Sequence, residues 1–402
     1  MITSNLQPFR EQLDTFTTAG EYQECIRYEA EYMDSPDAPR EVGATLEAID
    51  TYRTVSVKAH MGVGKTTLLC GMLRQLWDKD NTTKVLVLSS RRSLSATLYS
   101  SIMTRMAGTT CDVKLYLDVM DDSRAMHSAD ILVISPESLV RLNDGDVFSF
   151  NADTVVIDEY SSFNFHVSQS DTLRNRRRDV MAIYEFLMHD AVRVWTLDAD
   201  HDDGCTKLLR RWRGMDDSLL IWNTKTKNPF KYYVHDFDED EQPVITQLRA
   251  NIRAGKKCYV VSDGKRHSDR VKKRIEFDDD DGAKVLFDAL GVEGKKGLLI
   301  NSESNNRDFN KFKDVEGWWS EYDYVVVSPT VSYGTSFDPA VPHFDCIYGF
   351  FSGKSVLAQT ACQMLHRVRK LAGKEQKVVL CVSGKTRFCG DELKAVIHLP
   401  CQ

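Results

Sequence analysis

The segment Val55-Ser-Val-Lys-Ala-His-Met-Gly-Val-Gly-Lys-Thr-Thr-Leu-Leu, residues 55–69, joins a β-branched run to a glycine-containing turn and a helix beginning at Lys65. Gly62 and Gly64 allow backbone N–H groups to close around a phosphate, which a side chain would obstruct. Lys65 can reach the β- and γ-phosphates of a nucleotide, and the Thr66 hydroxyl can bind Mg²⁺. An ordinary glycine-rich turn is the alternative, but it does not explain why all these parts occur together. The segment predicts an ATP- and Mg²⁺-binding loop made by Gly62, Val63, Gly64, Lys65, Thr66 and Thr67.

A second chemical element, Thr154-Val-Val-Ile-Asp-Glu-Tyr, follows further along the chain. A buried strand would deliver Asp158 and Glu159 at its carboxyl end, where ligands bind in open α/β sheets. Asp158 would hold Mg²⁺ through water, and Glu159 would orient and deprotonate an attacking water. An acidic pair after a strand is common, so this interpretation depends on the phosphate-binding loop that precedes it.

The third constellation is Gln359-Thr-Ala-Cys-Gln-Met-Leu-His-Arg-Val-Arg-Lys. At helical spacing Gln363 and Arg367 share one face, which suits two side chains that reach the same ligand. Arginine is suited to stabilising charge on a transferring phosphoryl group. A basic helix end is the alternative interpretation of the same pattern.

Short β-branched runs, each ending in polar or small residues, recur along the chain. They are Val55–Lys58, Lys84–Leu88, Ile131–Ile134, Thr154–Ile157, Val192–Leu197, Lys257–Val261, Gly297–Ile300, Tyr324–Val327, Cys346–Phe350 and Lys377–Val382. Apolar runs separated by helical stretches are typical of buried parallel strands in doubly wound sheets. We expect the first five in one sheet and the last five in another. The predicted fold class is α/β, with two tandem domains that each hold a mainly parallel sheet flanked by helices.

The domain boundary is expected in the stretch Lys225–Gln242, which carries Asn228-Pro229 and an acidic run. The predicted divisions are an N-terminal helical extension (residues 1–36), a first α/β domain (37–226) and a second (227–402). The acidic segment Phe277–Asp281 is predicted to be an exposed loop, with a metal site as the alternative.

The composition of the 402-residue chain is that of a globular protein, with 42 % hydrophobic and 28 % charged residues. The sequence has no apolar run of about 18 residues, which a membrane span needs, and no signal-peptide pattern. Its ten cysteines form no zinc-binding array; we expect buried free thiols in a reducing compartment, cytoplasmic or nuclear. The net charge of -7 argues against coating of nucleic acid by bulk charge. Arg174–Arg178 and Lys207–Arg213 are candidate basic patches, although a solvated face is the favoured interpretation of each.

The segment Tyr324-Val-Val-Val-Ser-Pro-Thr-Val-Ser-Tyr-Gly-Thr-Ser-Phe-Asp is the most specific of the remaining motifs. It resembles the fifth motif of superfamily 2 helicases, in particular the helicase core of the herpesvirus origin-binding protein family and its relatives in large DNA viruses and plasmids. Ala59, in place of the first glycine of the general phosphate-binding loop, fits the helicase version of that loop. Further matches are Val85-Leu-Val-Leu-Ser-Ser-Arg-Arg (motif Ia), Ile134-Ser-Pro-Glu (Ib), Leu197-Asp-Ala-Asp (III), Val260-Val-Ser-Asp (IV) and Gln363-Met-Leu-His-Arg-Val-Arg (VI). The resemblance covers most of the chain.

The resemblance implies two RecA-like domains and a role for each matching residue. Lys65 and Thr66 would bind phosphates and Mg²⁺, while Asp158 and Glu159 would serve hydrolysis. Arg367 and Arg369 would point at the γ-phosphate from the second domain. Asp198 and Asp200 would link the state of ATP to strand movement, and Gly334 and Asp338 would help join motif V to the ATP site. The residues implied to touch the nucleic-acid backbone are Ser89, Arg91, Arg92, Ser135 and Ser328 to Thr330.

Three features depart from the family pattern. His366 occupies the place where many relatives have glycine, and Asp200 replaces the usual Thr or Ser of motif III. Coupling of hydrolysis to unwinding is therefore less firmly implied than hydrolysis itself. The sequence also ends soon after motif VI, where the herpesvirus proteins carry a domain that reads the origin. Sequence-specific origin binding is accordingly not expected here.

The sequence thus predicts an ATP-hydrolysing helicase or translocase of superfamily 2. Its expected partners are single-stranded nucleic acid, with DNA favoured over RNA by family likeness, and replication proteins; no membrane is expected. Contacts mostly to phosphate would make strand binding salt-sensitive and largely sequence-independent. The alternatives are an RNA helicase or remodelling ATPase, a non-catalytic scaffold, and a P-loop kinase or unrelated NTPase, which would need only one sheet.

Overall fold

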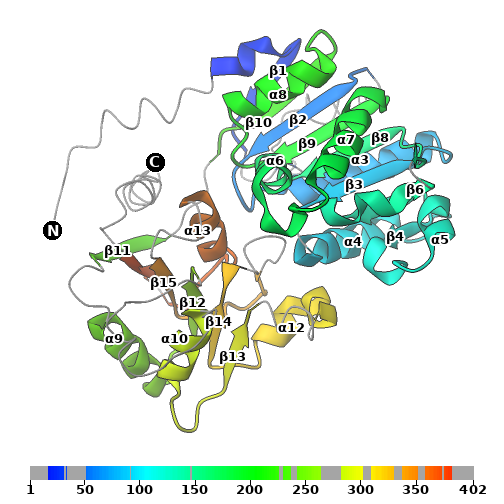
Figure 1. Cartoon of the computed structure of the whole chain (residues 1–402). Coiled ribbons are helices and arrows are strands. Elements are labelled where there is room, and N and C mark those ends of the chain that lie inside the picture. Colours follow the sequence, from blue (N-terminus) through cyan, green and yellow to red (C-terminus); the bar gives the residue numbers. More distant parts are fainter. Residues whose placement is uncertain are drawn as a thin grey trace. The chain divides into compact units, whose positions relative to one another are not determined.

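The computed structural model describes residues 17–30, 33, 51–90, 92–144, 147–225, 230–236, 242–263, 282–301, 309–329, 337–351, 358–373 and 375–382. These residues form two compact units, one within residues 12–227 and the other within residues 228–402. Each unit is built on one large parallel sheet (Figure 1). The predicted α/β fold with two tandem parallel sheets is confirmed. The linker residues Asn228-Pro229 and the acidic segment Phe277–Asp281 lie outside the described residues.

The first unit holds an eight-stranded sheet in which every neighbouring pair of strands is parallel. Across the sheet the order is β1 (Glu24–Tyr28), β10 (Ser218–Asn223), β2 (Thr54–Ala59), β9 (Arg193–Asp198), β8 (Thr154–Asp158), β3 (Val85–Ser89), β5 (Ile131–Ile134) and β4 (Val113–Leu115). Because the strands are parallel, their carboxyl ends meet at one edge. That edge carries the loops in which sequence analysis places the chemistry.

The second unit holds a six-stranded sheet that is also parallel throughout. Its order is β11 (Lys231–Asp236), β16 (Lys377–Val382), β15 (Cys346–Phe351), β12 (Cys258–Ser262), β14 (Tyr324–Val327) and β13 (Gly297–Ile300). Alternate residues of these strands enter two separate apolar clusters, Tyr259 and Val261 in one and Cys258 and Val260 in the other. Since successive side chains of a strand point to opposite faces, both faces of this sheet are buried.

Helices connect the strands of both sheets. Those of the first unit are α3 (Lys65–Lys79), α4 (Arg92–Met106), α5 (Ser123–Ser128), α6 (Tyr160–Gln169), α7 (Arg177–Asp190) and α8 (Asp203–Arg213), with the 3-10 helices η1 (Thr17–Glu21), η2 (Tyr116–Asp118), η3 (Pro136–Leu142) and η4 (Asp171–Leu173) and the small hairpin β6 (Asn143–Asp144) and β7 (Val147–Phe148). Those of the second unit are α9 (Gln242–Arg253), η6 (Phe309–Asp314), α10 (Gly282–Leu290), α12 (Val315–Trp319) and α13 (Ala358–Leu365). None of the helices in the described part of the chain has the length and apolar character of a membrane span.

The predicted strands are all present, with ends that agree to within one residue. The strands β1, β4, β10 and β11 and the small hairpin of β6 and β7 were not predicted. Of these, β1, β4 and β11 are edge strands, which carry fewer apolar residues because neighbouring strands cover one side only. By contrast, β10 contains the apolar run Leu219–Trp222 and could have been found from its sequence.

The prediction of an N-terminal helical extension over residues 1–36 is wrong at Glu24–Tyr28, although Thr17–Glu21 forms the short 3-10 helix η1. Residues Glu24–Tyr28 form β1, which pairs with β10 in the first sheet. Only Tyr28 of this strand is buried, so the strand lacks the apolar run that marks a buried strand. Further along the segment, the Met33 N–H donates a hydrogen bond of 2.7 Å to the Val63 carbonyl. Residues Glu24–Tyr28 are therefore part of the first sheet.

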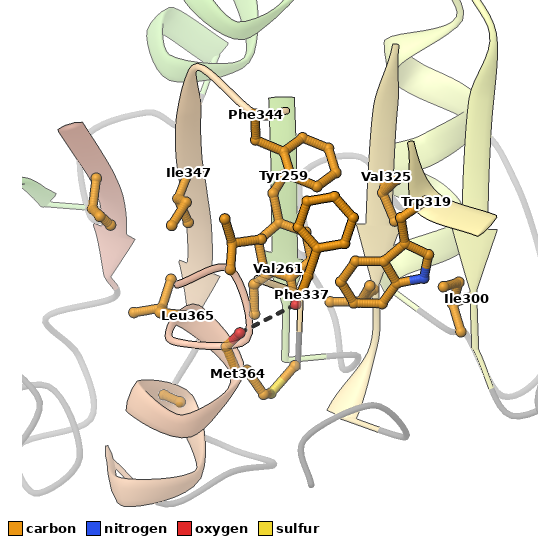
Figure 2. Packing of buried hydrophobic residues seen from close by; sticks show 14 of the residues in the cluster. Tyr259, Val261, Ile300, Trp319, Val325, Phe337, Phe344, Ile347, Met364 and Leu365 are labelled. Carbon is orange, nitrogen blue, oxygen red and sulfur yellow. Dashed lines mark hydrogen bonds between the residues drawn. The ribbon is translucent and has the colours of Figure 1, made fainter. Parts of the chain in front are cut away.

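The core of the second unit is rich in aromatic rings. Figure 2 shows Tyr259, Trp319, Phe337 and Phe344 packed together, with the Tyr259 hydroxyl donating to the Met364 carbonyl over 3.1 Å. The rings of Trp319 and Phe337 are stacked, with centroids 5.6 Å apart. This packing fixes α13 and the chain that follows it against the sheet, and so positions motif VI.

Free buried thiols were predicted, and the described cysteines agree for the most part. None of the described cysteines forms a disulfide, and Cys70, Cys205, Cys258, Cys346, Cys362 and Cys381 are buried. Cys25 is exposed because it lies on the edge strand β1. Cys389 and Cys401 lie outside the described residues.

The predicted basic patch Lys207–Arg213 has a structural role at its end. Arg213 donates hydrogen bonds to the carbonyls of Ala191 (2.8 Å), Val192 (3.1 Å) and Arg53 (3.3 Å). Burial, and then the charge of Arg53, lowers the pKa of Arg213 to about 10. These carbonyls stand just before β9 and β2, at the amino edge of the sheet. Arg213 therefore ties strands together at the edge opposite the predicted site.

Replacing Arg213 by alanine should lower the free energy of unfolding of the first unit by about 2–3 kcal/mol, because several carbonyls lose a charged donor. The matched control is Arg211→Ala, an exposed arginine on the same helix, which should change it by less than about 0.5 kcal/mol. Urea titration of the three proteins measures both values. Equal effects of the two substitutions would contradict the structural role.

Candidate nucleotide and nucleic-acid site

The turn between β2 and α3 holds the glycines of the predicted phosphate-binding loop. Gly62 and Gly64 have φ angles of 80° and 97°, a region that favours glycine. The Lys65 side chain is buried, and its Nζ donates a hydrogen bond of 2.9 Å to the Ala59 carbonyl. Thr66 is half-buried on the first turn of α3. The first N–H groups of a helix lack intrahelical partners, so this turn has the backbone form of an anion-binding site.

The acidic pair follows β8 at the same edge of the sheet. Glu159 has a φ of 54°, and no other non-glycine residue in the described ranges has a positive φ. That strained conformation turns the chain from β8 into α6 within one residue. Burial, and then the charge of Glu159, raises the pKa of Asp158 to about 7, while the charge of Lys65 opposes the rise. Lys65 and the acidic pair therefore lie in one site of the first unit.

Motif III lies between these two elements, because β9 pairs with β2 on one side and with β8 on the other. Asp198 is fully buried, and its two oxygens accept hydrogen bonds from the backbone N–H groups of Ser161 and Asp200. Burial, and then the charge of Asp198, raises the pKa of Asp200 to about 7. The site thus concentrates buried carboxylates, a chemistry that suits a bound divalent cation.

The serines predicted to touch nucleic acid also lie at this edge. Ser89 ends β3 and Ser135 follows β5, but both side chains are buried. Neither hydroxyl is therefore exposed to a ligand. Arg92 begins α4, and Arg91 lies outside the described residues.

Sequence analysis missed the residue that anchors motif Ib. The Glu137 carboxylate lies 2.7 Å from His166 Nε2 and accepts a hydrogen bond of 2.9 Å from the Thr172 hydroxyl. Burial favours the neutral acid, but the contacts with His166 prevail and hold the pKa of Glu137 at about 2. These contacts join η3 to the end of α6, the helix that follows the acidic pair. The partners are about 30 residues apart in sequence, so no local pattern indicates them.

The Glu137 contacts predict a pH-dependent contribution to stability. Its pKa is depressed below the ordinary value of 4.5, so the contribution is present above that value and is lost as pH falls towards about 2. The free energy of unfolding of Glu137→Gln should therefore lie well below that of the wild type near neutral pH, and the two should converge only as the pH falls to about 2. Urea titrations across this range, with exposed Glu185→Gln on α7 as control, measure the difference. A difference that does not change with pH would contradict the prediction.

In the second unit, motif VI departs from the predicted single helical face. α13 ends at Leu365, before Arg367, because the chain then bends to pair with Phe337. The Phe337 N–H donates to the Arg367 carbonyl over 2.7 Å, and the Arg369 N–H donates to the Phe337 carbonyl over 3.1 Å. Gln363 and Arg367 are both buried, but Arg367 lies beyond the end of the helix, so the two do not share the regular i, i+4 face.

His366, which replaces the glycine of many relatives, is buried beside the first strand of this unit. Its Nε2 lies 3.1 Å from the Tyr232 hydroxyl of β11, and its Nδ1 lies 2.7 Å from the Cys362 carbonyl. A glycine could make neither contact. The substitution therefore ties motif VI to β11, a link that sequence analysis did not anticipate.

The remaining predicted residues of this unit are less closely grouped. Ser328 follows β14 and is buried, with its N–H donating to the Ile300 carbonyl over 2.9 Å. Asp338 is exposed and forms an ion pair of 3.3 Å with Lys370. Thr330 and Gly334 lie outside the described residues.

Comparison with known proteins agrees with the motif pattern. Residues 40–235 match the model of a family described as origin of replication binding protein. The predicted family resemblance is confirmed. A putative helicase/primase complex protein of African swine fever virus is 26 % identical over 387 residues, which cover 94 % of this chain and 33 % of that protein. A putative replication origin-binding protein of Acanthamoeba polyphaga mimivirus is 24 % identical, with coverage of 89 % and 41 %. The chain therefore spans about a third of the length of the African swine fever virus relatives it matches.

Solved helicase structures share the fold. S. cerevisiae Dbp5 bound to RNA and ADP BeF3 is 13 % identical, with a TM-score of 0.63, and covers 92 % of this chain and 93 % of that chain. The helicase MrfA bound to DNA is 13 % identical, with a TM-score of 0.56, and covers 85 % of this chain and 48 % of that chain. The two sheets are therefore tandem RecA-like domains.

Proposed function

We propose that the chain is an ATP-dependent helicase or translocase that acts on DNA during replication. The observation that carries the proposal is the grouping at the carboxyl edge of the first sheet. There Lys65, on a turn with two positive-φ glycines, lies in one electrostatic site with the buried Asp158. A scaffold that only binds nucleic acid has no need for buried, mutually repelling carboxylates, which cost stability.

ATP fits this edge through its phosphates. The turn before α3 offers backbone N–H groups and the positive end of the helix dipole, and Lys65 adds a charge. Lys65 Nζ already lies 2.9 Å from the Ala59 carbonyl at the base of the turn, so a phosphate in the turn would be within its reach. Gly62, Val63, Gly64, Thr66 and Thr67 complete the proposed phosphate contacts.

Mg²⁺ fits the donor set of the same edge. The Thr66 hydroxyl and the Asp158 carboxylate are oxygen ligands of the kind Mg²⁺ prefers. The raised pKa of Asp158 reflects buried negative charge that a divalent cation would neutralise. When bound, Mg²⁺ supplies charge neutralisation to the β- and γ-phosphates.

The remaining residues would have separate roles in hydrolysis. Glu159, turned at the end of β8 by its positive φ, would orient the attacking water and accept its proton. Gln363, Arg367 and Arg369 of the second unit would contribute charge and hydrogen bonds to the γ-phosphate. Asp338 and Gly334 would support them from motif V. Hydrolysis would then depend on both RecA-like domains, which is how such motors couple turnover to movement.

Nucleic acid would bind along the carboxyl edges of both sheets. The turns at Ser89 and Ser135 in the first unit and at Ser328 in the second would contact phosphates. Arg91, Arg92 and Thr330, which stand next to these serines or close to them in the sequence, would add further contacts. Relatives named for replication origins and a helicase/primase complex favour DNA. The RNA bound to Dbp5 supports the alternative, an RNA helicase or remodelling ATPase.

The proposal is tested by strand displacement on matched duplexes. Each duplex carries a single-stranded tail, and DNA and RNA versions share one sequence. We expect ATP- and Mg²⁺-dependent displacement of the DNA duplex, abolished in Glu159→Gln. Displacement of the RNA duplex alone would establish the RNA alternative. Nucleic-acid binding with neither hydrolysis nor displacement would support the alternative of a non-catalytic scaffold.

A further inference from the structure

A buried polar cluster lies beneath the loop that follows β9. His201, three residues after Asp198, is fully buried. Its Nε2 lies 2.9 Å from the Tyr22 hydroxyl and 3.2 Å from the Thr206 hydroxyl, and its ring stacks on Tyr160 at a centroid distance of 6.0 Å. Tyr22 comes from the N-terminal segment, 179 residues away in sequence. The cluster therefore joins parts of the chain that no local motif connects.

The hydrogen-bond directions define the state of the imidazole. The Tyr22 hydroxyl donates to the Ser56 hydroxyl over 2.9 Å, and Ser56 also accepts from Thr196 over 2.9 Å. With the Tyr22 proton directed to Ser56, the Tyr22 oxygen can accept a hydrogen bond from a protonated His201 Nε2. Burial lowers the pKa of His201 to about 4, so the ring is neutral near pH 7. A neutral donor is thus held in one orientation.

The main chain of His201 is fixed from another side. Its carbonyl accepts a hydrogen bond from Lys58 Nζ, on the strand that leads into the phosphate-binding turn. Just before it, the Asp200 N–H donates to Asp198 over 2.7 Å, and Asp198 also accepts from the Ser161 N–H at the start of α6. One loop, Asp198–Asp202, therefore contacts the strand before the phosphate-binding turn and the helix after the acidic pair.

The N-terminal segment is itself held firmly around Tyr22. The Thr18 backbone N–H and hydroxyl donate to the Asp203 carboxylate over 3.0 and 2.8 Å. Glu21 pairs with Arg210 of α8 at 3.0 Å, and β1 continues the sheet beside β10. These contacts fix the position of Tyr22, and Tyr22 in turn orients the His201 ring.

We propose that His201, oriented by Tyr22, is a positioning residue that sets the conformation of the Asp198–Asp202 loop and thereby the rate of ATP turnover. The inference rests on the proposed ATPase function. His201 touches neither nucleotide nor metal in this scheme; it acts through Asp198 and Asp200. Loss of its imidazole should therefore reduce kcat more than it changes the KM for ATP.

The test compares variants of the full chain. His201→Ala removes the contacts of the imidazole with Tyr22, Thr206 and Tyr160. Tyr22→Phe removes one hydroxyl, and His201→Gln restores a side-chain donor. Tyr184→Phe is the matched control: it removes another buried hydroxyl of the first unit, which donates to Asn164 over 2.9 Å. Steady-state kinetics, thermal midpoints and amide hydrogen exchange of residues 199–202 are measured for each.

We expect His201→Ala to lower kcat about tenfold or more with a KM changed less than about threefold, since small misplacements of catalytic groups are costly. His201→Gln should recover much of the loss. Exchange of the loop amides should speed up in His201→Ala and Tyr22→Phe but not in Tyr184→Phe.

An unchanged kcat and unchanged loop exchange in His201→Ala and Tyr22→Phe would overturn the inference. So would a kcat that falls as far in Tyr184→Phe, since that would reflect stability alone. The exchange measurement needs no ATPase activity, so the two proposals fail differently. If the wild type does not hydrolyse ATP, both the proposed function and the link to turnover are wrong. If the wild type is active and the variants keep its kcat and loop exchange, only the inference about His201 is wrong.

Discussion

Lys65→Ala is expected to hydrolyse ATP about a hundredfold to a thousandfold more slowly than the wild type, the range seen when one charge-stabilising donor is removed. Lys65 is buried directly after the glycine turn, and its charge lowers the pKa of Asp158 against the effect of burial. Alanine removes the cation that would meet the β- and γ-phosphates and leaves the carboxylates without a counter-charge. Binding of single-stranded nucleic acid should remain within about twofold, because its contacts lie in other turns.

The matched control for this variant is Lys79→Ala, at the far end of the same helix. Lys79 is exposed, and its loss should leave turnover unchanged. Thermal midpoints of both variants guard against a folding defect. Wild-type turnover in Lys65→Ala would refute the assignment of the phosphate-binding loop, whatever the other residues do.

The second large effect is expected at Arg367. Arg367→Ala should lower ATP turnover about a thousandfold while leaving ATP binding nearly unchanged, because an arginine of this kind stabilises charge that develops during transfer. Arg367→Lys keeps the charge but loses the planar fork, so it should recover only part of the rate. Turnover and equilibrium binding of a fluorescent ATP analogue separate the two effects.

Arg367 is buried in its own unit, so its removal can also disturb packing. Arg253→Ala, an exposed arginine at the end of α9, is the control for the loss of a positive charge in the second unit. If Arg367→Lys and Arg367→Ala both keep wild-type turnover with normal thermal midpoints, motif VI has no part in hydrolysis.

The buried strands could be predicted from the sequence because a strand buried on both faces needs a continuous apolar run. Ile131–Ile134 and Tyr324–Val327 were predicted residue for residue for this reason. Edge strands such as Glu24–Tyr28 carry no such run, and this one was mistaken for helix. The site residues that end strands, such as Asp158 and Asp198, could also be predicted, since parallel strands bring their carboxyl ends to one edge.

What could not be predicted are the long-range partners of polar groups. Nothing near Tyr22 in the sequence indicates His201, and nothing near Arg213 indicates the carbonyl of Arg53. The end of α13 at Leu365 is a further case, since pairing with Phe337 and not a local stop signal ends the helix. These contacts arise from packing. The contact of His201 with Tyr22 supports a loop that motif III had already located, whereas the contact of Arg213 lies at the opposite edge of the sheet.

The measurement that tests the central claim most directly is Mg²⁺-dependent ATP hydrolysis by the full chain, alone and with single-stranded DNA, duplex DNA or RNA. The account predicts hydrolysis that single-stranded DNA stimulates most strongly, and that added salt weakens by displacing the strand. No hydrolysis under any of these conditions would contradict it.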